Sequence, residues 1–192
     1  SFTGTIYLQP GATIRFSANS SGNTYGSFNP TLVINGTVQP RNAGNTIQLG
    51  AFSGSGTLAG AQSASGTGDT TYVIGGNDAD ATFSGVISSN SAVVGSDVSV
   101  NKIGAGRLTL SGASTYNSGT TVSAGTLRVI NTAGSATGFG DLEAFAGATL
   151  TGNGSIASAT TIDNGAILSP GDPAGTLTIA SSRTLNDSSL LQ

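Results

Sequence analysis

The clearest fold signal in the chain is 102-KIGAGRLTLSGASTYNSGTTVSAGTLRV-129. Two short apolar runs, Leu108-Thr109-Leu110 and Leu127-Arg128-Val129, lie among Gly, Ser, Thr and Asn. Within the runs, apolar and polar residues alternate with a period of two, which is typical of β-strands and not of helices. The stretch contains no His, Cys, Asp or Glu. It therefore predicts a structural unit that repeats, and not a site of chemistry.

The same unit recurs along the chain as a small residue, a glycine and an apolar strand. It is found at 104–110, 123–129, 145–152, 163–171 and 173–179. The glycines of the first four copies are Gly106, Gly125, Gly147 and Gly165. A packet that recurs at this spacing indicates stacked coils, because antiparallel sandwiches usually have longer strands with turns at closer spacing.

We therefore predict an all-β fold, a single-stranded right-handed parallel β-helix (β-solenoid), with the hand that parallel crossovers prefer. With about 20 residues per coil, roughly nine coils would form a rod on the order of 45 Å long. We expect residues 1–192 to form one continuous solenoid. Within it, 1–70 would be degenerate N-terminal coils and 71–185 the regular repeat region.

The 102–129 stretch resembles the autotransporter-associated β-strand repeat, also called the passenger-associated transport repeat. The positions that match its pattern are Lys102, Gly104, Gly106, Leu108, Leu110, Gly112, Thr115, Tyr116, Gly119, Thr121, Val122, Gly125 and Leu127. The resemblance extends more loosely from Thr71 to Ile179. It implies a β-helical protein that a bacterium secretes or displays on its surface, and in autotransporters the repeat is linked to passenger export.

Composition excludes several classes of function. Only 8% of residues are charged, with 6 basic and 9 acidic side chains and a net charge of −3. The scattered basic residues predict no nucleic-acid binding, and without an apolar run of about 18 residues we expect no membrane insertion. There is no Cys and no His, so no disulfide forms and no nucleophilic triad can be drawn. We expect a non-enzymatic protein without a cofactor.

Four groups of side chains are nevertheless candidates for chemistry. In 75-GGNDADATF-83, Asp78 and Asp80 faintly resemble the Ca²⁺-binding nonapeptide of RTX proteins, although a polar surface turn is the simpler interpretation. Asp141 and Glu143 alternate, so on a strand both point to one face. Such a pair could act in a glycoside hydrolase, but a solvated surface pair is the simpler interpretation.

Arginines and aromatic residues provide the other two groups. Arg107 and Arg128 follow related repeat glycines and could stack one coil apart, which would place them on an outward face, paired with Asp or Glu. They could also grip an acidic glycan, but a solvated surface position is the simpler interpretation. Tyr25 and Phe28, in the loop 20-SSGNTYGSFNP-30, are the candidates for a sugar-stacking platform, although core packing is the commoner use of aromatic residues.

The most consistent interpretation is a secreted structural β-solenoid on the bacterial cell surface, serving as a stalk, an adhesin segment or a self-associating filament subunit. The alternatives are a carbohydrate-binding module and a polysaccharide-active β-helix enzyme. A β-helix has two open ends with unpaired backbone groups, and the chain begins with SFTGTIYLQPGATIRF, which is apolar without a polar cap. We therefore expect self-association through the solenoid ends or the terminal strands.

Overall fold

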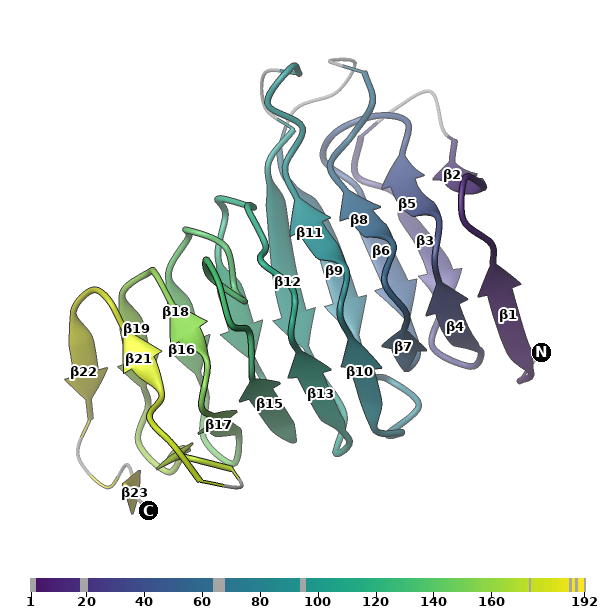
Figure 1. Cartoon of the computed structure of the whole chain (residues 1–192). Helices are drawn as coiled ribbons and strands as arrows, with labels where there is room; N and C mark the ends of the chain where they lie inside the picture. Colours follow the sequence, from purple (N-terminus) through teal and green to yellow (C-terminus); the bar gives the residue numbers. More distant parts are fainter. Residues whose placement is uncertain are drawn as a thin grey trace.

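The computed structural model describes residues 3–17, 21–63, 68–93, 96–172, 174–186, 188 and 190–191. These residues form strands and turns, and none of them lies in a helix that could cross a membrane. The strands build a parallel β-solenoid of about 8 turns, which confirms the predicted fold. The near strands in Figure 1 run upward and the far strands downward while the coils advance from N to C, so the solenoid is right-handed.

Most coils contribute one strand to each of three faces. Face I consists of β1 (Thr5–Leu8), β4 (Thr31–Ile34), β7 (Phe52–Ser53), β10 (Ala81–Phe83), β13 (Arg107–Leu110), β15 (Thr126–Val129), β17 (Thr149–Gly152), β20 (Ile167–Pro170) and β23 (Leu190–Leu191). Face II consists of β2 (Thr13–Phe16), β5 (Thr37–Pro40), β8 (Thr57–Ala59), β11 (Val86–Ser88), β18 (Ser155–Ile156) and β21 (Thr178–Ile179). Face III consists of β3 (Thr24–Ser27), β6 (Thr46–Leu49), β9 (Thr70–Ile74), β12 (Val98–Lys102), β14 (Thr120–Val122), β16 (Leu142–Ala144), β19 (Thr160–Ile162) and β22 (Arg183–Leu185).

Face II is interrupted in the middle of the solenoid. Between β11 and β18, the segments 111–119 and 130–141 replace a strand in two successive coils. Ser114 and Ser135 hold these segments together through an antiparallel bridge, in which the Ser114 N–H donates to the Ser135 carbonyl oxygen at 2.7 Å. The repeat stretch 102–129 thus supplies strands to faces I and III and an irregular connection on face II.

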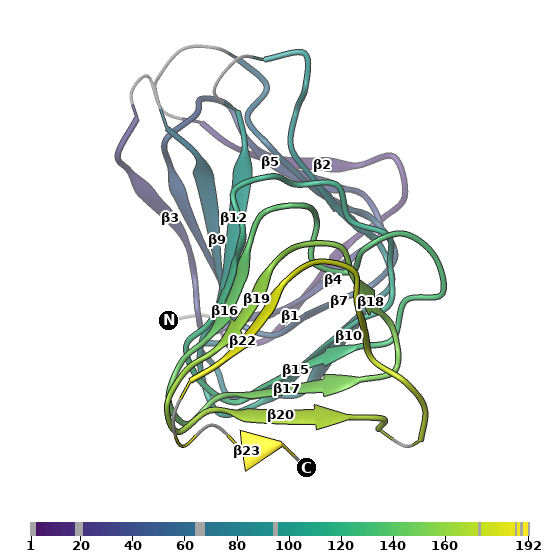
Figure 2. The ribbon, with the colours of Figure 1, turned by 90° about the vertical axis from the view of Figure 1, so that its left-hand side faces the viewer.

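The core is a set of apolar columns that run along the axis. On face I, the side chains of Leu108, Leu127, Leu150 and Leu168 stack in register, and each is at most 2% exposed. Polar residues at the intervening positions face outward and form ladders, as between Thr71 Oγ1 and Ser99 Oγ at 3.0 Å on face III. The view along the axis in Figure 2 shows the coils superposed around this common interior.

The coils are less uniform than the sequence period predicts. On face I, Thr149 lies beside Ile167, which closes a short coil, whereas Gly54 lies beside Phe83, which closes a much longer one. The longer coils lie in the N-terminal half, where they extend further on one side (Figure 1). The solenoid therefore has about 8 turns and fewer layers than a uniform coil length predicts, because loops at the coil corners lengthen the coil without adding a layer.

A stack of glycines forms the corner between faces I and II. A Cβ atom added to Gly56, Gly85 or Gly112 would lie 2.1, 2.0 or 1.8 Å from the carbonyl oxygen of the preceding glycine in the stack. No side chain fits at these distances, so glycine is required by the close approach of two backbones. This requirement explains why a glycine lies two residues after each of the strands β4, β10 and β13.

Candidate functional site

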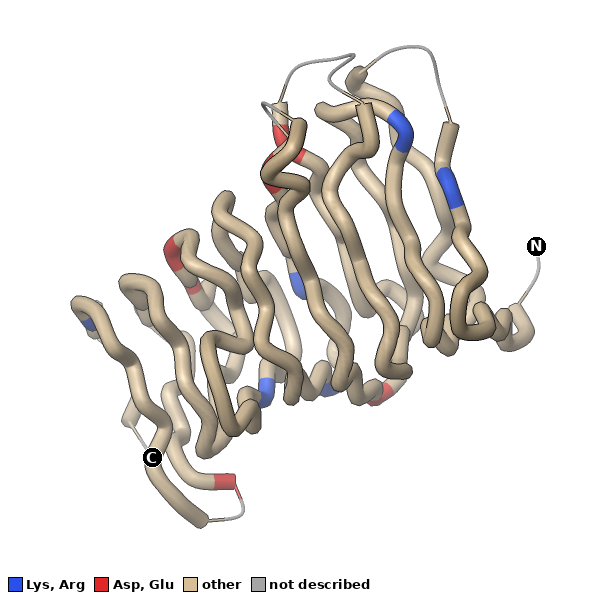
Figure 3. The backbone as a smooth tube through the Cα atoms, turned by 45° about the horizontal axis from the view of Figure 1, so that its top comes forward, with Lys and Arg blue, Asp and Glu red and all other residues tan. Residues whose placement is uncertain are grey.

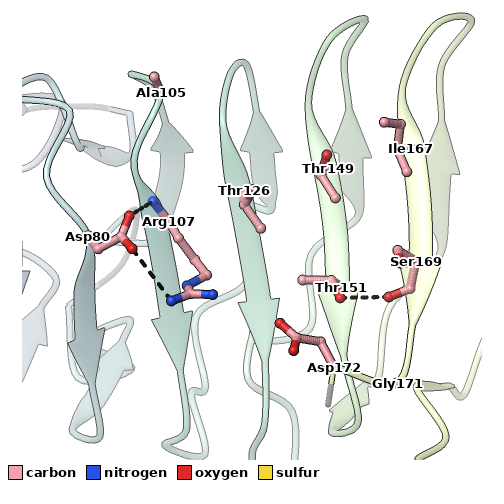
Figure 4. Close-up of a pocket in the computed structure, with 10 residues that line it drawn as sticks. All are labelled: Asp80, Ala105, Arg107, Thr126, Thr149, Thr151, Ile167, Ser169, Gly171 and Asp172. Atoms are coloured by element: carbon pink, nitrogen blue, oxygen red, sulfur yellow. Dashed lines mark hydrogen bonds and ion pairs between the residues drawn. The ribbon is translucent and has the colours of Figure 1, made fainter. Parts of the chain in front are cut away.

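The outer surface of face I is hollowed into a shallow groove of about 570 Å³ that spans β10 to β20 (Figure 4). Hydroxyl groups of Thr126, Thr149, Thr151 and Ser169 line it across three successive coils. These side chains line the surface because they occupy outward positions of strands whose alternate leucines fill the core. We call this feature the lateral groove.

Two ion pairs flank the lateral groove. Asp80 accepts a hydrogen bond from the Arg107 backbone N–H at 2.7 Å, and its Oδ2 lies 3.5 Å from Arg107 Nη2. The Arg128 Nε lies 3.1 Å from Asp172 Oδ2, and Arg128 Nη2 donates to the Asp172 carbonyl oxygen at 2.6 Å. The expectation that both arginines pair with acidic residues is confirmed.

The expectation that Arg107 and Arg128 stack on one another was wrong. The register places Arg107 beside Thr126 and Arg128 beside Thr109, so the two arginines lie diagonally across adjacent strands. The offset keeps like charges apart and brings each guanidinium to a different aspartate. The sequence indicated neither aspartate as a partner, because Arg107 and Asp80 are 27 residues apart and Arg128 and Asp172 are 44 residues apart.

The charges around the lateral groove balance one another. Each arginine is matched by one carboxylate, so the groove has no excess of either sign with which to select an ionic ligand. The Arg107–Asp80 side chains are 48% and 64% exposed, and exposed pairs of this kind contribute about 0–1 kcal/mol. What the groove offers to a polar, uncharged ligand is the hydroxyl groups of Thr126, Thr149 and Ser169, because Thr151 is buried and its Oγ1 donates to the Ser169 carbonyl oxygen at 2.6 Å.

Asp78 and Asp80 both serve the contact between coils. Asp78 has a left-handed φ of 59°, and its Oδ1 accepts a hydrogen bond from the Ala105 N–H at 2.7 Å, in the next coil. Asp80 Oδ1 likewise accepts a hydrogen bond from the Arg107 N–H of the next coil. Within the described ranges, no three acidic side chains converge as a metal site needs. The Ca²⁺ interpretation of these two residues stays a prediction, and their observed contacts are structural.

The two aromatic candidates lie near the N-terminal end of the solenoid. Tyr25 lies in strand β3 and not in a loop, and its ring stacks on Phe16 with centroids 5.9 Å apart. Phe28 packs beside Gly76, where an added Cβ would lie 2.4 Å from its ring. Both side chains are half-buried. A glycan platform at these residues stays a prediction.

Asp141 and Glu143 are both exposed and flank the buried Leu142 of β16, so they point outward as the alternation predicts. Glu143 lies between Thr121 and Thr161 in the ladder of face III. Figure 3 shows that charged residues are few and are distributed over several coils.

Sequence reasoning did not anticipate that Lys102 is buried. Its side chain occupies an inward position of β12, and the residue is 1% exposed. The ammonium group donates to the carbonyl oxygens of Ile103 at 2.6 Å, Gly104 at 2.9 Å and Ala124 at 3.2 Å. Burial lowers the pKa of Lys102 to about 8, although the nearby carboxylates of Asp78 and Asp80 oppose this shift.

Lys102, the one lysine of the repeat stretch, connects two successive coils. Its three hydrogen bonds tie the turn after β12 to the corresponding turn of the next coil, at the corner between faces III and I. The signal was present in the sequence, because Val98 and Val100 set the inward positions of the strand and Lys102 continues their period.

Two buried tyrosines brace the interior in a similar way. The Tyr72 hydroxyl lies 2.7 Å from the Ala59 carbonyl oxygen and 3.1 Å from that of Val38, so its single proton is shared between two acceptors across the core, from face III to face II. The buried Tyr116 hydroxyl, in the segment 111–119 that interrupts face II, forms a hydrogen bond with Thr120 Oγ1. Burial raises the pKa of both hydroxyls above the ordinary value for tyrosine.

Comparison with known families agrees with this geometry. Residues 100–129 match the family described as the passenger-associated-transport-repeat. The chain thus contains the repeat to which its sequence is similar, and an autotransporter-associated repeat protein fits both the match and the solenoid. No curated protein and no solved structure matches the chain. The repeat and the fold together fit an autotransporter passenger-like structural domain.

Proposed function

We propose that this chain is a rigid structural segment of an exported bacterial protein, displayed outside the cell as a stalk or adhesin segment. The single observation that supports this function most directly is the place of the passenger-associated transport repeat within the solenoid. The matched residues 100–129 form part of the continuous ladders of faces I and III.

Coil geometry accounts for the distinctive residues of that repeat. Leu108 and Leu127 fill a core column, Gly112 permits the close approach of the backbone, and Lys102 clamps two turns. Each parallel coil adds about 4.8 Å along the axis, and the stacked coils form a stiff rod. A segment whose residues serve this stacking is suited to holding other segments of a protein at a distance.

The placement is tested by antibody labelling of the producing bacteria. With an antibody against the folded chain, we expect intact cells to be labelled as strongly as permeabilised cells. Labelling that requires permeabilisation would overturn the proposed display outside the cell. An antibody against a periplasmic protein provides the control for intact envelopes, because it must label permeabilised cells only.

A glycan array distinguishes the structural role from the carbohydrate-binding alternative. We expect no specific binding by the native chain. Specific binding that is lost in Thr149→Val would assign a ligand to the lateral groove, whereas loss in Tyr25→Ala would assign it to the aromatic candidates. Either result would overturn a purely structural role, and Asp141→Asn, which changes an exposed side chain elsewhere, is the matched control.

A further inference from the structure

Asparagine is followed directly by glycine at three places in the chain, residues 35–36, 153–154 and 164–165. In this dipeptide the backbone nitrogen of the glycine can attack the side-chain amide of the asparagine, because glycine has no Cβ to hinder the approach. The attack requires an accessible amide and a glycine that can move toward it. The three pairs share this chemistry, but the fold gives them different surroundings.

The pair at 164–165 is exposed and loosely held. Asn164 and Gly165 lie in the turn 163–166 between β19 and β20, and no described residue hydrogen-bonds the Asn164 side chain. A Cβ atom added to Gly165 would meet nothing closer than Ala146 at 3.5 Å. The Gly165 N–H donates to the Ser188 carbonyl oxygen at 3.3 Å, longer than the usual distance of about 2.9–3.0 Å. Both reacting groups are therefore able to move.

Coils lie on both sides of this turn, so Asn164 is exposed because it points outward from the rod. The pairing of β16 with β19 and of β17 with β20 places Ala146 of the preceding coil beside Asn164. On the opposite side, Asn186 Nδ2 of the following coil donates to Asp163 Oδ1 at 3.0 Å. The alanine at the equivalent position shows that the turn does not need an asparagine for its shape.

The pair at 35–36 is held on both sides of the bond that would react. Asn35 Oδ1 accepts a hydrogen bond from the Ser55 N–H at 3.2 Å and lies 3.3 Å from Ser55 Oγ. Gly36 is buried, and a Cβ atom added to it would lie 2.2 Å from the Ala12 carbonyl oxygen. Neither the amide nor the glycine nitrogen can approach the other without breaking these contacts.

The pair at 153–154 has an exposed asparagine but a fixed glycine. Gly154 is buried, and its N–H donates to the Val129 carbonyl oxygen at 2.9 Å. A Cβ atom added to Gly154 would lie 2.4 Å from Asn131 Oδ1, so the glycine has no space in which to move. The attacking nitrogen of this pair is held away from the Asn153 amide by the preceding coil.

The geometry points to a modification site at Asn164, where the side-chain amide is converted spontaneously into a carboxylate while the chain is folded. The Gly165 backbone nitrogen gives up its proton to hydroxide or a buffer base and bonds to Asn164 Cγ. The Cγ–Nδ2 bond breaks, and Nδ2 takes a proton from solvent and leaves as ammonia. Water then opens one of the two C–N bonds of the cyclic imide, which gives aspartate or isoaspartate. Water is the only co-reactant, and no electrons are transferred.

The modification changes a contact between coils. It adds a negative charge next to Asp163, and isoaspartate also lengthens the backbone of the turn that contacts Asn186 and Ser188. The inference does not rest on the proposed structural role. Its failure would leave the test of display on intact cells unaffected.

Peptide mapping by mass spectrometry during incubation of the folded chain at mildly alkaline pH tests this inference. Cleavage before aspartate places the three pairs in separate peptides, because Asp163 lies between Asn153 and Asn164. We expect the Asn164 peptide to gain the mass difference between an amide and an acid, in two isomers that chromatography separates. The Asn35 and Asn153 peptides should react at least about tenfold more slowly, because they must first lose close contacts.

The same chain unfolded in urea provides the reference rate of each pair, so the ratio of folded to unfolded rates isolates the effect of the fold. This ratio must be highest at Asn164. Equal ratios at the three pairs overturn the inference, as does an Asn164 that stays unchanged in the folded chain while the unfolded chain is converted.

Asn164→Ala is the matched control, since Ala146 occupies the equivalent position of the preceding coil. The native chain must acquire an acidic form on ion-exchange chromatography, and the variant must not acquire it over the same period. An acidic form that appears equally in the variant overturns the assignment to Asn164. Circular dichroism before and after incubation verifies that both proteins stay folded.

Discussion

Replacing Gly112 with alanine tests whether the glycine corner determines how the coils pack. Gly112 does not have a left-handed φ, so its own backbone conformation would accept alanine. In the absence of a close contact, Gly→Ala stabilises a protein by about 0.4–1 kcal/mol, because the unfolded chain loses freedom. The structure predicts the opposite sign.

The magnitude follows from the distances. The new Cβ would lie 1.8 Å from the Gly85 carbonyl oxygen, against a lower limit near 3.0 Å for real contacts, so the two coils must separate by roughly 1 Å. This movement strains the Ser111 N–H to Phe83 O hydrogen bond, now 3.0 Å long. Overpacking costs about 1–3 kcal/mol, and each lost hydrogen bond adds about 1 kcal/mol. We expect a loss of about 2–4 kcal/mol.

Thermal unfolding followed by far-ultraviolet circular dichroism measures this loss. For a chain of this size, about 1 kcal/mol shifts the Tm by roughly 2–4 °C, so the variant should melt about 4–16 °C below the native chain. Gly147→Ala is the matched control. Gly147 has open space around it but a φ of 83°, so alanine there should cost only about 1–2 kcal/mol. A Gly112→Ala variant as stable as the native chain would refute the close approach of the coils.

Three further perturbations probe the buried and paired side chains. Because burial lowers the pKa of Lys102 to about 8, the folded chain binds fewer protons than the unfolded chain up to the ordinary value of 10.5. Unfolding free energy should therefore rise with pH across this window, by at most about 3 kcal/mol relative to Lys102→Met in urea titrations. Ionisation of the buried tyrosines in the unfolded chain lowers stability at the top of the window in both proteins, so the comparison cancels it. Tyr72→Phe removes the hydrogen bonds of a buried hydroxyl and should cost about 1–2 kcal/mol in the same titrations, without changing the fold seen by circular dichroism. Asp80→Asn should cost about 1 kcal/mol, while Asp141→Asn, on an exposed residue, should change stability by less than about 0.5 kcal/mol.

The candidate site was only partly predictable. Alternation within the strands was enough to place Asp141 and Glu143 on the outside and to predict that the arginines face solvent. It did not indicate the partner of Arg128, because Asp172 reaches the arginine only through the number of residues in each intervening coil. The lateral groove depends on the same register, since its hydroxyl groups come from three coils.

Lys102 shows a second limit of sequence reasoning. The alternation of inward and outward residues along β12 already places Lys102 in the interior. A lysine in the interior is expected only if acceptors are available to its ammonium group. Those acceptors are carbonyl oxygens of two turns that are brought together by coil stacking, Ile103 and Gly104 in one coil and Ala124 in the next. Backbone acceptors leave no trace in the side-chain pattern.

Sequence patterns alone predict that this protein coils. Short alternating runs can only form strands that bury one side, and regularly recurring glycines return the chain to the same layer. The folded structure was needed to establish the lengths of individual coils, the pairing of Arg128 with Asp172 and the burial of Lys102. The reason is physical: alternation is a local property of the chain, whereas stacking register depends on how many residues each corner loop contains.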